Sequence, residues 1–177
     1  MSTGASNAIK ALNESRDFLN KNSELSNAMF IGSIIPKIAI ISAASEYEKR
    51  ILTLLEQSAS NLDNKEGLIL GLVRNKAIKR QYHTYFDWDN LKIGSFQSLV
   101  GPKLSKLLND KMNKNSVFKQ SVQSFLEIGG YRNILVHSDF LSCPINLSID
   151  AVGIKINEAN NFVVWLESEI GSAYRVT

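Results

Sequence analysis

Two side chains suited to phosphate chemistry stand close together late in the sequence. Arg132 is followed directly by Asn133, and His137 comes five positions after the arginine. A guanidinium can bind a phosphate through two parallel hydrogen bonds, and an imidazole can take up or release a proton near pH 7. The spacing indicates a candidate site for reaction at a phosphate. A structural histidine held by hydrogen bonds is the alternative for His137.

The apolar run 134–136, which separates the two side chains, predicts a packed helix. Five residues of α-helix rotate by about 140°, so Arg132 and His137 lie on different faces. Asn133 and His137 are four residues apart and share a face. Arg132 must therefore reach around the helix, or the two side chains must flank a groove.

A carboxylate on an apolar helix face is the second candidate. Glu48 lies on a stripe whose other members, Ser45 excepted, are apolar. Because an unpaired buried charge is unfavourable, we expect a cation beside Glu48, and Arg132 is the candidate. A glutamate that reaches solvent, or one paired with Lys49 or Arg50, accounts for the same pattern.

The elements that must position these residues are helices. Apolar residues recur three or four apart through most of the chain, and no strand series is visible. This pattern predicts an all-α, up-and-down bundle of four to six helices in a single domain, residues 1–177. The aromatic residues of the segment 86–96 should pack on the core of this bundle.

Three local signals should set helix boundaries. Ser33 and Pro36 favour the start of a long helix, because proline is tolerated in the first turn. Asn157 should begin the last helix. The glycine pair 129–130 should kink or end its helix, because two adjacent glycines weaken a helix interior. Close packing against a neighbour is a second explanation for this pair.

Composition excludes several classes of protein. The chain has 177 residues, 44% of them hydrophobic, and a single cysteine, Cys143, which excludes an internal disulfide and a zinc site built from cysteines. The longest apolar stretch, 34–44, is interrupted by Pro36, Lys37 and Ser42, so we expect no membrane span. Without a basic and apolar leader at the N-terminus, we expect a cytoplasmic protein.

Positive charge is concentrated in the middle of the chain. The segment 74–119 contains ten basic and three acidic residues, which indicates an anionic partner such as RNA. A solvated lysine-rich surface is the alternative. His83 lies here among aromatic residues and is not expected to be catalytic. The candidate RNA-binding residues are Arg74, Lys76, Lys79 and Arg80.

Two motifs together resemble those of the HEPN superfamily. Ser45-Glu46-Tyr47-Glu48 fits the pattern S-x-[FY]-E, and the run from Arg132 to His137 fits R-[NDH]-x-x-x-H. The segment 86–104, with its tryptophan, phenylalanine and Gly-Pro pair, resembles the prokaryotic RiboL-PSP-HEPN-like branch. The resemblance extends in layout over residues 5–174 and implies an all-helical fold.

The resemblance also implies an activity, a metal-independent endoribonuclease whose site forms between two protomers. His137 would then act as general acid or base, and Arg132 would hold the scissile phosphate. Asn133 would orient the phosphate or the histidine, and Glu48 would fix Arg132. No cofactor and no metal are implied.

Partners and alternatives follow from the same resemblance. A toxin or antiviral-defence effector of this kind would act on RNA as a homodimer, with an antitoxin or defence-system protein as a further partner. A catalytically silent HEPN-type dimerisation or binding module is the main alternative, and an unrelated helical protein with an accidental motif is another. Asp139 stands where some HEPN toxins carry a tyrosine, and it is positioned in sequence to contact His137.

Overall fold

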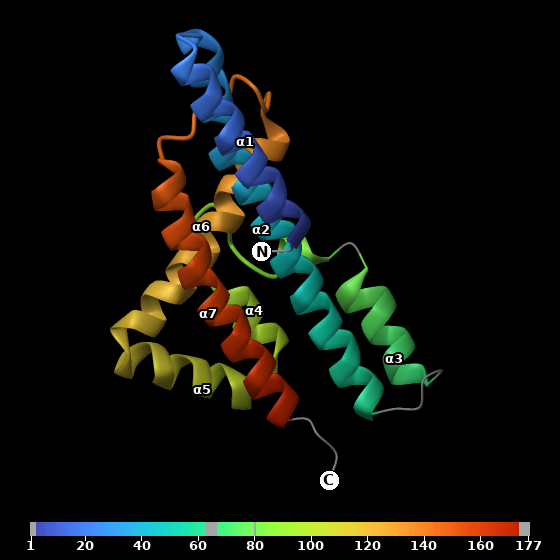
Figure 1. The fold of residues 1–177 in the computed structure, drawn as a ribbon. Coiled ribbons are helices and arrows are strands. Elements are labelled where there is room, and N and C mark those ends of the chain that lie inside the picture. Colours follow the sequence, from blue (N-terminus) through green and yellow to red (C-terminus); the bar gives the residue numbers. More distant parts are fainter. Residues whose placement is uncertain (1–2, 63–66, 80, 174–177) are drawn as a thin grey trace.

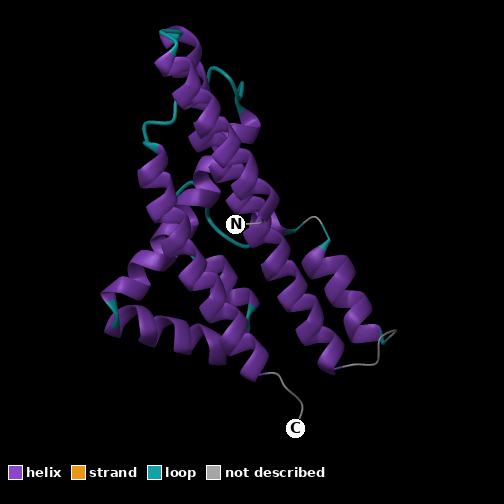
Figure 2. Ribbon diagram, in the orientation of Figure 1, coloured by secondary structure: helices purple, strands orange, loops and turns teal. Residues whose placement is uncertain are grey.

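Five long helices and two short ones form the structure, a computed structural model that describes residues 3–62, 67–79 and 81–173 (Figures 1 and 2). No strand occurs in these ranges, which confirms the all-α prediction. A π-helical turn at Val73–Ile78 follows α3, and a 3₁₀ turn at Tyr82–Thr84 comes next. The helices are α1 (Thr3–Lys21), α2 (Leu25–Leu62), α3 (Leu68–Leu72), α4 (Gly94–Leu99), α5 (Gly101–Lys114), α6 (Ser116–His137) and α7 (Ile149–Ala173).

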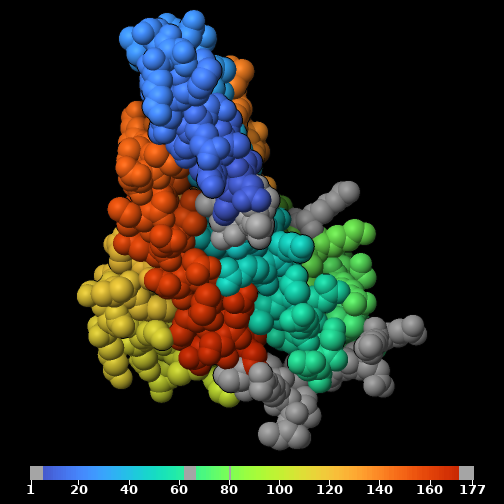
Figure 3. All heavy atoms as spheres, viewed as in Figure 1, coloured from blue at the N-terminus to red at the C-terminus, as the bar shows by residue number. Residues whose placement is uncertain are grey.

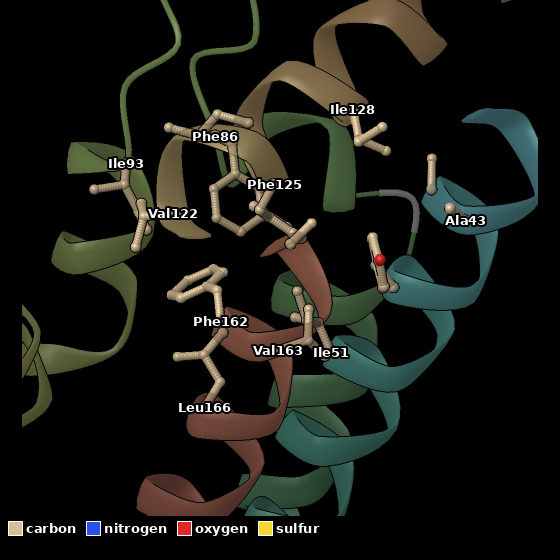
Figure 4. Close-up of a cluster of buried hydrophobic side chains, with 14 of the residues drawn as sticks. Ala43, Ile51, Phe86, Ile93, Val122, Phe125, Ile128, Phe162, Val163 and Leu166 are labelled. Carbon is tan, nitrogen blue, oxygen red and sulfur yellow. The ribbon is translucent and has the colours of Figure 1, made fainter. Parts of the chain in front are cut away.

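The core lies where α2, α6 and α7 pack together (Figure 4). Phe125 of α6 is at its centre, with ring centroids 5.0 Å from both Phe86 and Phe162 in edge-on arrangements. Such contacts add stability beyond the buried area of the rings. Ala43 and Ile51 contribute from α2, so this long helix supports one whole side of the core.

The connection between the π-helical turn and α4 also packs inward, as predicted. Phe86, Trp88 and Phe96 are buried, and the rings of Phe86 and Phe96 stack with centroids 5.0 Å apart. This segment carries no long helix, so its position depends on these aromatic contacts. It forms one wall of the cleft described below.

The predicted start of the long helix at Ser33 or Pro36 was wrong. Helix α2 begins at Leu25, and Pro36 lies inside it. Proline in a helix interior removes one backbone hydrogen bond and is locally unfavourable. The first third of α2 packs along α1 and forms a hairpin with it. The end of this hairpin projects from the rest of the molecule at the top of Figure 3. Packing against α1 therefore outweighs the local signal.

Two further boundary predictions were wrong. Helix α7 begins at Ile149, because Ser148 Oγ accepts a hydrogen bond from Ala151 N at 3.1 Å and so caps the helix eight residues before Asn157. Helix α6 runs without interruption through the pair 129–130. The ring of Trp88 lies against Gly129, and the carbonyl oxygen of Trp88 lies close to Gly130, so the second explanation, close packing, describes their role.

Among the described residues, one helix is long and apolar enough to cross a membrane by length and composition, the stretch Leu25–Asn61 of α2. That criterion does not by itself indicate a membrane span, because the core helix of a soluble protein meets it too. Nearly half of the most apolar window is buried inside the fold.

Candidate active site

The last turns of α6 carry Arg132, Asn133 and His137. The helix starts from a cap, in which Asn115 Oδ1 accepts from Phe118 N at 2.9 Å, and ends at His137. Of the apolar run 134–136, only Leu135 is buried, since three consecutive residues cannot all face one side of a helix. The expected packing of this segment thus rests on one side chain, and the others remain half exposed.

Glu48 lies beside Arg132 across the interface of α2 with α6. Arg132 Nη2 is 3.8 Å from Glu48 Oε2, and each side chain is one-third exposed. Arg132 Nη1 also donates to Asn133 Oδ1 at 3.3 Å. The alternative partner Arg50 is occupied elsewhere, because its guanidinium donates two hydrogen bonds to Glu167, at 2.8 and 2.7 Å. The carboxylate of Glu48 therefore lies at ion-pair distance from the arginine, which keeps part of its guanidinium open to solvent.

These side chains open into a cleft of about 540 Å³ between α2, α6 and the segment 78–89. We call it the α2–α6 cleft. Glu48, Arg132, Asn133 and His137 all line it, so the structure gathers the four predicted site residues at one surface. A narrower cavity continues inward past Gly129. The arrangement can hold one anionic group against Arg132 with an imidazole nearby.

The opposite wall of the α2–α6 cleft was not predicted. It includes Tyr82, His83, Asp87 and Asp89, together with Trp88. The sequence predicted core packing for the aromatic residues of the segment 86–96, and no motif among the residues of this wall indicates a cleft. The one sequence signal for this wall was the high proportion of polar and aromatic residues in the segment that precedes α4.

Charge in the cleft is mixed. Glu48, Asp87 and Asp89 bring three carboxylates, while Arg132 is its one lysine or arginine side chain among the described residues. Hydrogen bonds from the backbone and side chain of Asn90 hold the pKa of the Asp87 carboxyl below its usual range, so this group stays ionised. An anion is therefore favoured on the α6 side of the cleft and disfavoured near the Asp87 wall.

Tyr82 is not an acid–base group at neutral pH. Burial raises the pKa of its phenol far above the ordinary value, the charge of Glu48 raises it further, and Arg132 opposes the shift. The phenol therefore remains protonated.

Within the described residues, no group of three or more histidine, cysteine or acidic side chains is arranged to hold a metal ion.

Three of the four predicted RNA-binding residues lie outside the α2–α6 cleft. Arg74, Lys76 and Lys79 are exposed on and just after the π-helical turn and do not line the α2–α6 cleft. Arg74 Nε forms an ion pair with Glu56 Oε1 at 2.6 Å. Arg80 lies outside the described residues. An RNA contact at this basic segment stays a prediction.

The turn that follows His137 is held to α2 by a buried lysine. Lys37 is only 3% exposed, and its Nζ donates to the carbonyl oxygens of Phe140 and Leu141, each at 2.9 Å. The same atom lies 5.7 Å from the ring centroid of Phe140. Lysine is rarely buried without a partner, because desolvating an ammonium is costly. Helix α2 thus contacts both ends of the motif, Arg132 through Glu48 and the turn through Lys37.

Asp139 belongs to this turn and serves it locally. Its carboxylate accepts from Ser142 Oγ at 2.7 Å and from Leu141 N at 3.3 Å. These bonds hold the pKa of the Asp139 carboxyl below its usual range. The expected contact with His137 is therefore replaced by closure of the turn.

Replacing Lys37 by methionine should destabilise the fold. The apolar chain fits the buried path but leaves two carbonyl oxygens without their donor, which should lower the free energy of unfolding by about 1–3 kcal/mol. Urea denaturation followed by circular dichroism measures this change. Lys49→Met, at an exposed position of the same helix, should alter stability by less than about 0.5 kcal/mol. Equal stabilities for the two variants would contradict the anchoring role.

Comparison with known proteins identifies a family for the chain. The model of the RiboL-PSP-HEPN family matches residues 6–171, nearly the whole chain. No curated protein and no solved structure matches significantly. The family is associated with nucleases and nucleotide-binding modules. The chain belongs to the RiboL-PSP-HEPN family.

Proposed function

We propose that the protein is a metal-independent endoribonuclease that cleaves RNA by attack of a 2′-hydroxyl on the neighbouring phosphorus. One observation carries the proposal: an arginine paired with a glutamate, an amide and a histidine line a single open cleft. Arg132 would bind the phosphate and stabilise charge that develops on its oxygens. His137 would transfer a proton at the 2′-oxygen or at the leaving oxygen, and Asn133 would orient the phosphate or the imidazole.

A second copy of the chain completes the site in this proposal. The support is twofold. Three carboxylates face a single arginine in one copy of the cleft, so a second arginine would improve phosphate binding. Ile134, Val136 and Leu141, which flank His137, are each about half exposed, as expected of side chains that a partner covers.

Such an enzyme would act as a toxin or an antiviral effector in this proposal. Cleavage of cellular RNA stops growth, so an antitoxin or a defence-system protein would have to restrain it. Induced expression in a bacterial host tests this role: growth arrest that depends on His137 supports it, and normal growth with abundant folded protein contradicts it.

The activity itself is tested on a labelled RNA with excess EDTA. We expect chelator-resistant cleavage whose products end in a 2′,3′-cyclic phosphate and a 5′-hydroxyl. An RNA with 2′-O-methyl groups throughout should not be cut, because it lacks the attacking hydroxyl. No cleavage by folded protein, with or without added metal, would favour a catalytically silent dimerisation or binding module.

Ile134→Asp should separate the two copies. The side chain is 50% exposed between Arg132 and His137, so the change leaves the fold intact but places a charge at the proposed interface. Analytical ultracentrifugation should show a monomer, and RNA cleavage should fall at least tenfold. Ile154→Asp, on α7 and 60% exposed, is the matched control and should keep both dimer and activity. A stable, active Ile134→Asp dimer would contradict the proposed interface.

A further inference from the structure

Both histidines of the chain line the α2–α6 cleft. The sequence contains only two, and they lie 54 positions apart, so no local motif brings them together. His137 comes from the end of α6, whereas His83 comes from the 3₁₀ turn Tyr82–Thr84 on the opposite wall. The pairing is a product of the tertiary fold.

A specific contact chain fixes His83 relative to α6. Trp88 Nε1 donates to the carbonyl oxygen of His83 at 3.1 Å, which ties the turn to the indole. The indole in turn lies directly on α6: a Cβ at Gly129 would be 1.9 Å from Trp88 Cζ3. Only a residue without a side chain permits this approach. The backbone of His83 is thereby held against the helix that presents Arg132 and His137.

The imidazole of His83 is accessible to solvent. The side chain is exposed, and within the part of the chain that the structure describes neither ring nitrogen forms a hydrogen bond. Titratable and charged side chains reach the same cleft from every element around it. They are Glu48 from α2, Arg132 and His137 from α6, and Asp87 and Asp89 from its own segment.

We propose that His83 is a catalytic residue, the second proton-transfer group of the ribonuclease reaction; the inference rests on the proposed function. The reaction needs two proton transfers. As the bond from the 2′-oxygen to phosphorus forms, a base accepts the 2′-hydroxyl proton. As the bond from phosphorus to the 5′-oxygen breaks, an acid supplies a proton to that oxygen. His83 and His137 perform one transfer each, and Arg132 holds the phosphate between them.

The test compares His83→Ala and His83→Gln with the wild-type chain over pH 5–9. One neutral and one protonated imidazole give a bell-shaped rate profile, and loss of one histidine should remove one limb. At the optimum we expect the rate to fall about 100-fold, within the usual range for a general acid or base. Thr84→Ala, an exposed change in the same turn, should keep the full profile and controls for disturbance of the turn.

A substrate with sulfur in place of the bridging 5′-oxygen then assigns the roles. Its thiolate leaving group departs without protonation, so a His83 acid predicts that His83→Ala cuts this substrate nearly as fast as wild type. A His83 base predicts no such rescue together with loss of the acidic limb. Either result supports the pairing. A His83→Ala profile that keeps both limbs and its rate within threefold overturns it.

The two proposals fail in different ways. Cleavage that requires His137 but is indifferent to His83 removes the pairing and leaves the ribonuclease function intact. Absence of chelator-resistant cleavage by the wild-type chain overturns the proposed function, and the pairing with it. Circular dichroism and ultracentrifugation of the His83 variants confirm that fold and assembly are unchanged.

Discussion

His137→Ala should lower the rate of RNA cleavage by a factor of about 10²–10⁴, the usual contribution of a positioned general acid or base. The fold should not change, because the imidazole is exposed and the helix is closed at this point by main-chain atoms, with Ser138 N donating to Ile134 O at 3.0 Å. Single-turnover cleavage of a labelled RNA measures the effect on the chemical step directly.

The neighbouring position supplies the control. Ser138→Ala changes an exposed side chain just beyond α6 and should retain wild-type cleavage. Arg132→Lys keeps a positive charge but cannot bind a phosphate through two parallel donors, so its rate should lie between those of wild type and Arg132→Ala. Retention of more than a tenth of the activity by folded His137→Ala would remove His137 from the reaction.

Gly129→Ala should destabilise the protein. The added methyl would sit 1.9 Å from Trp88 Cζ3, well inside van der Waals contact, so the buried indole must move. Overpacking of this kind costs about 1–3 kcal/mol. At the upper end of that range, the cost exceeds the gain of about 1 kcal/mol that alanine normally brings to a helix interior. Urea denaturation should show a lower free energy of unfolding.

A second helical glycine gives a matched comparison. Gly153 of α7 has open space where a Cβ would stand, so Gly153→Ala should raise the free energy of unfolding by about 0.5–1 kcal/mol. The same substitution should thus have opposite signs at the two positions. Stabilisation by Gly129→Ala would show that the indole can move away at little cost. The indole would then not hold the turn that carries His83 firmly in place.

The helical class and the Glu48–Arg132 pair could be predicted from the sequence because both follow from periodicity and charge. A carboxylate on an apolar stripe needs a cation, and the arginine of the motif was available. The start of α2 could not be predicted in this way. Pro36 is a local signal for a helix start, and it was overridden by packing of the preceding turns along α1.

The second wall of the cleft was beyond the reach of pattern reasoning. His83 reaches the cleft only because Trp88 seats against Gly129, 41 positions later in the chain, and that contact has no periodic signature. The glycine pair was visible in the sequence. Its two explanations, a helix break or a close approach, can be distinguished only once the residue that contacts the pair is known. The apolar run 134–136 likewise did not indicate that Ile134 and Val136 are half exposed, and these two side chains are part of the proposed interface.

The lysine anchor on α2 has a consequence for how ionic strength should act. Mobile ions screen interactions between exposed charges, such as the proposed contacts of Lys76 or Lys79 with a nucleic acid, but they do not reach a buried ammonium that is bonded to carbonyl oxygens. Added salt should therefore weaken capture of RNA while the turn beyond His137 keeps its geometry. Substrate affinity and turnover of bound substrate should consequently respond separately to salt.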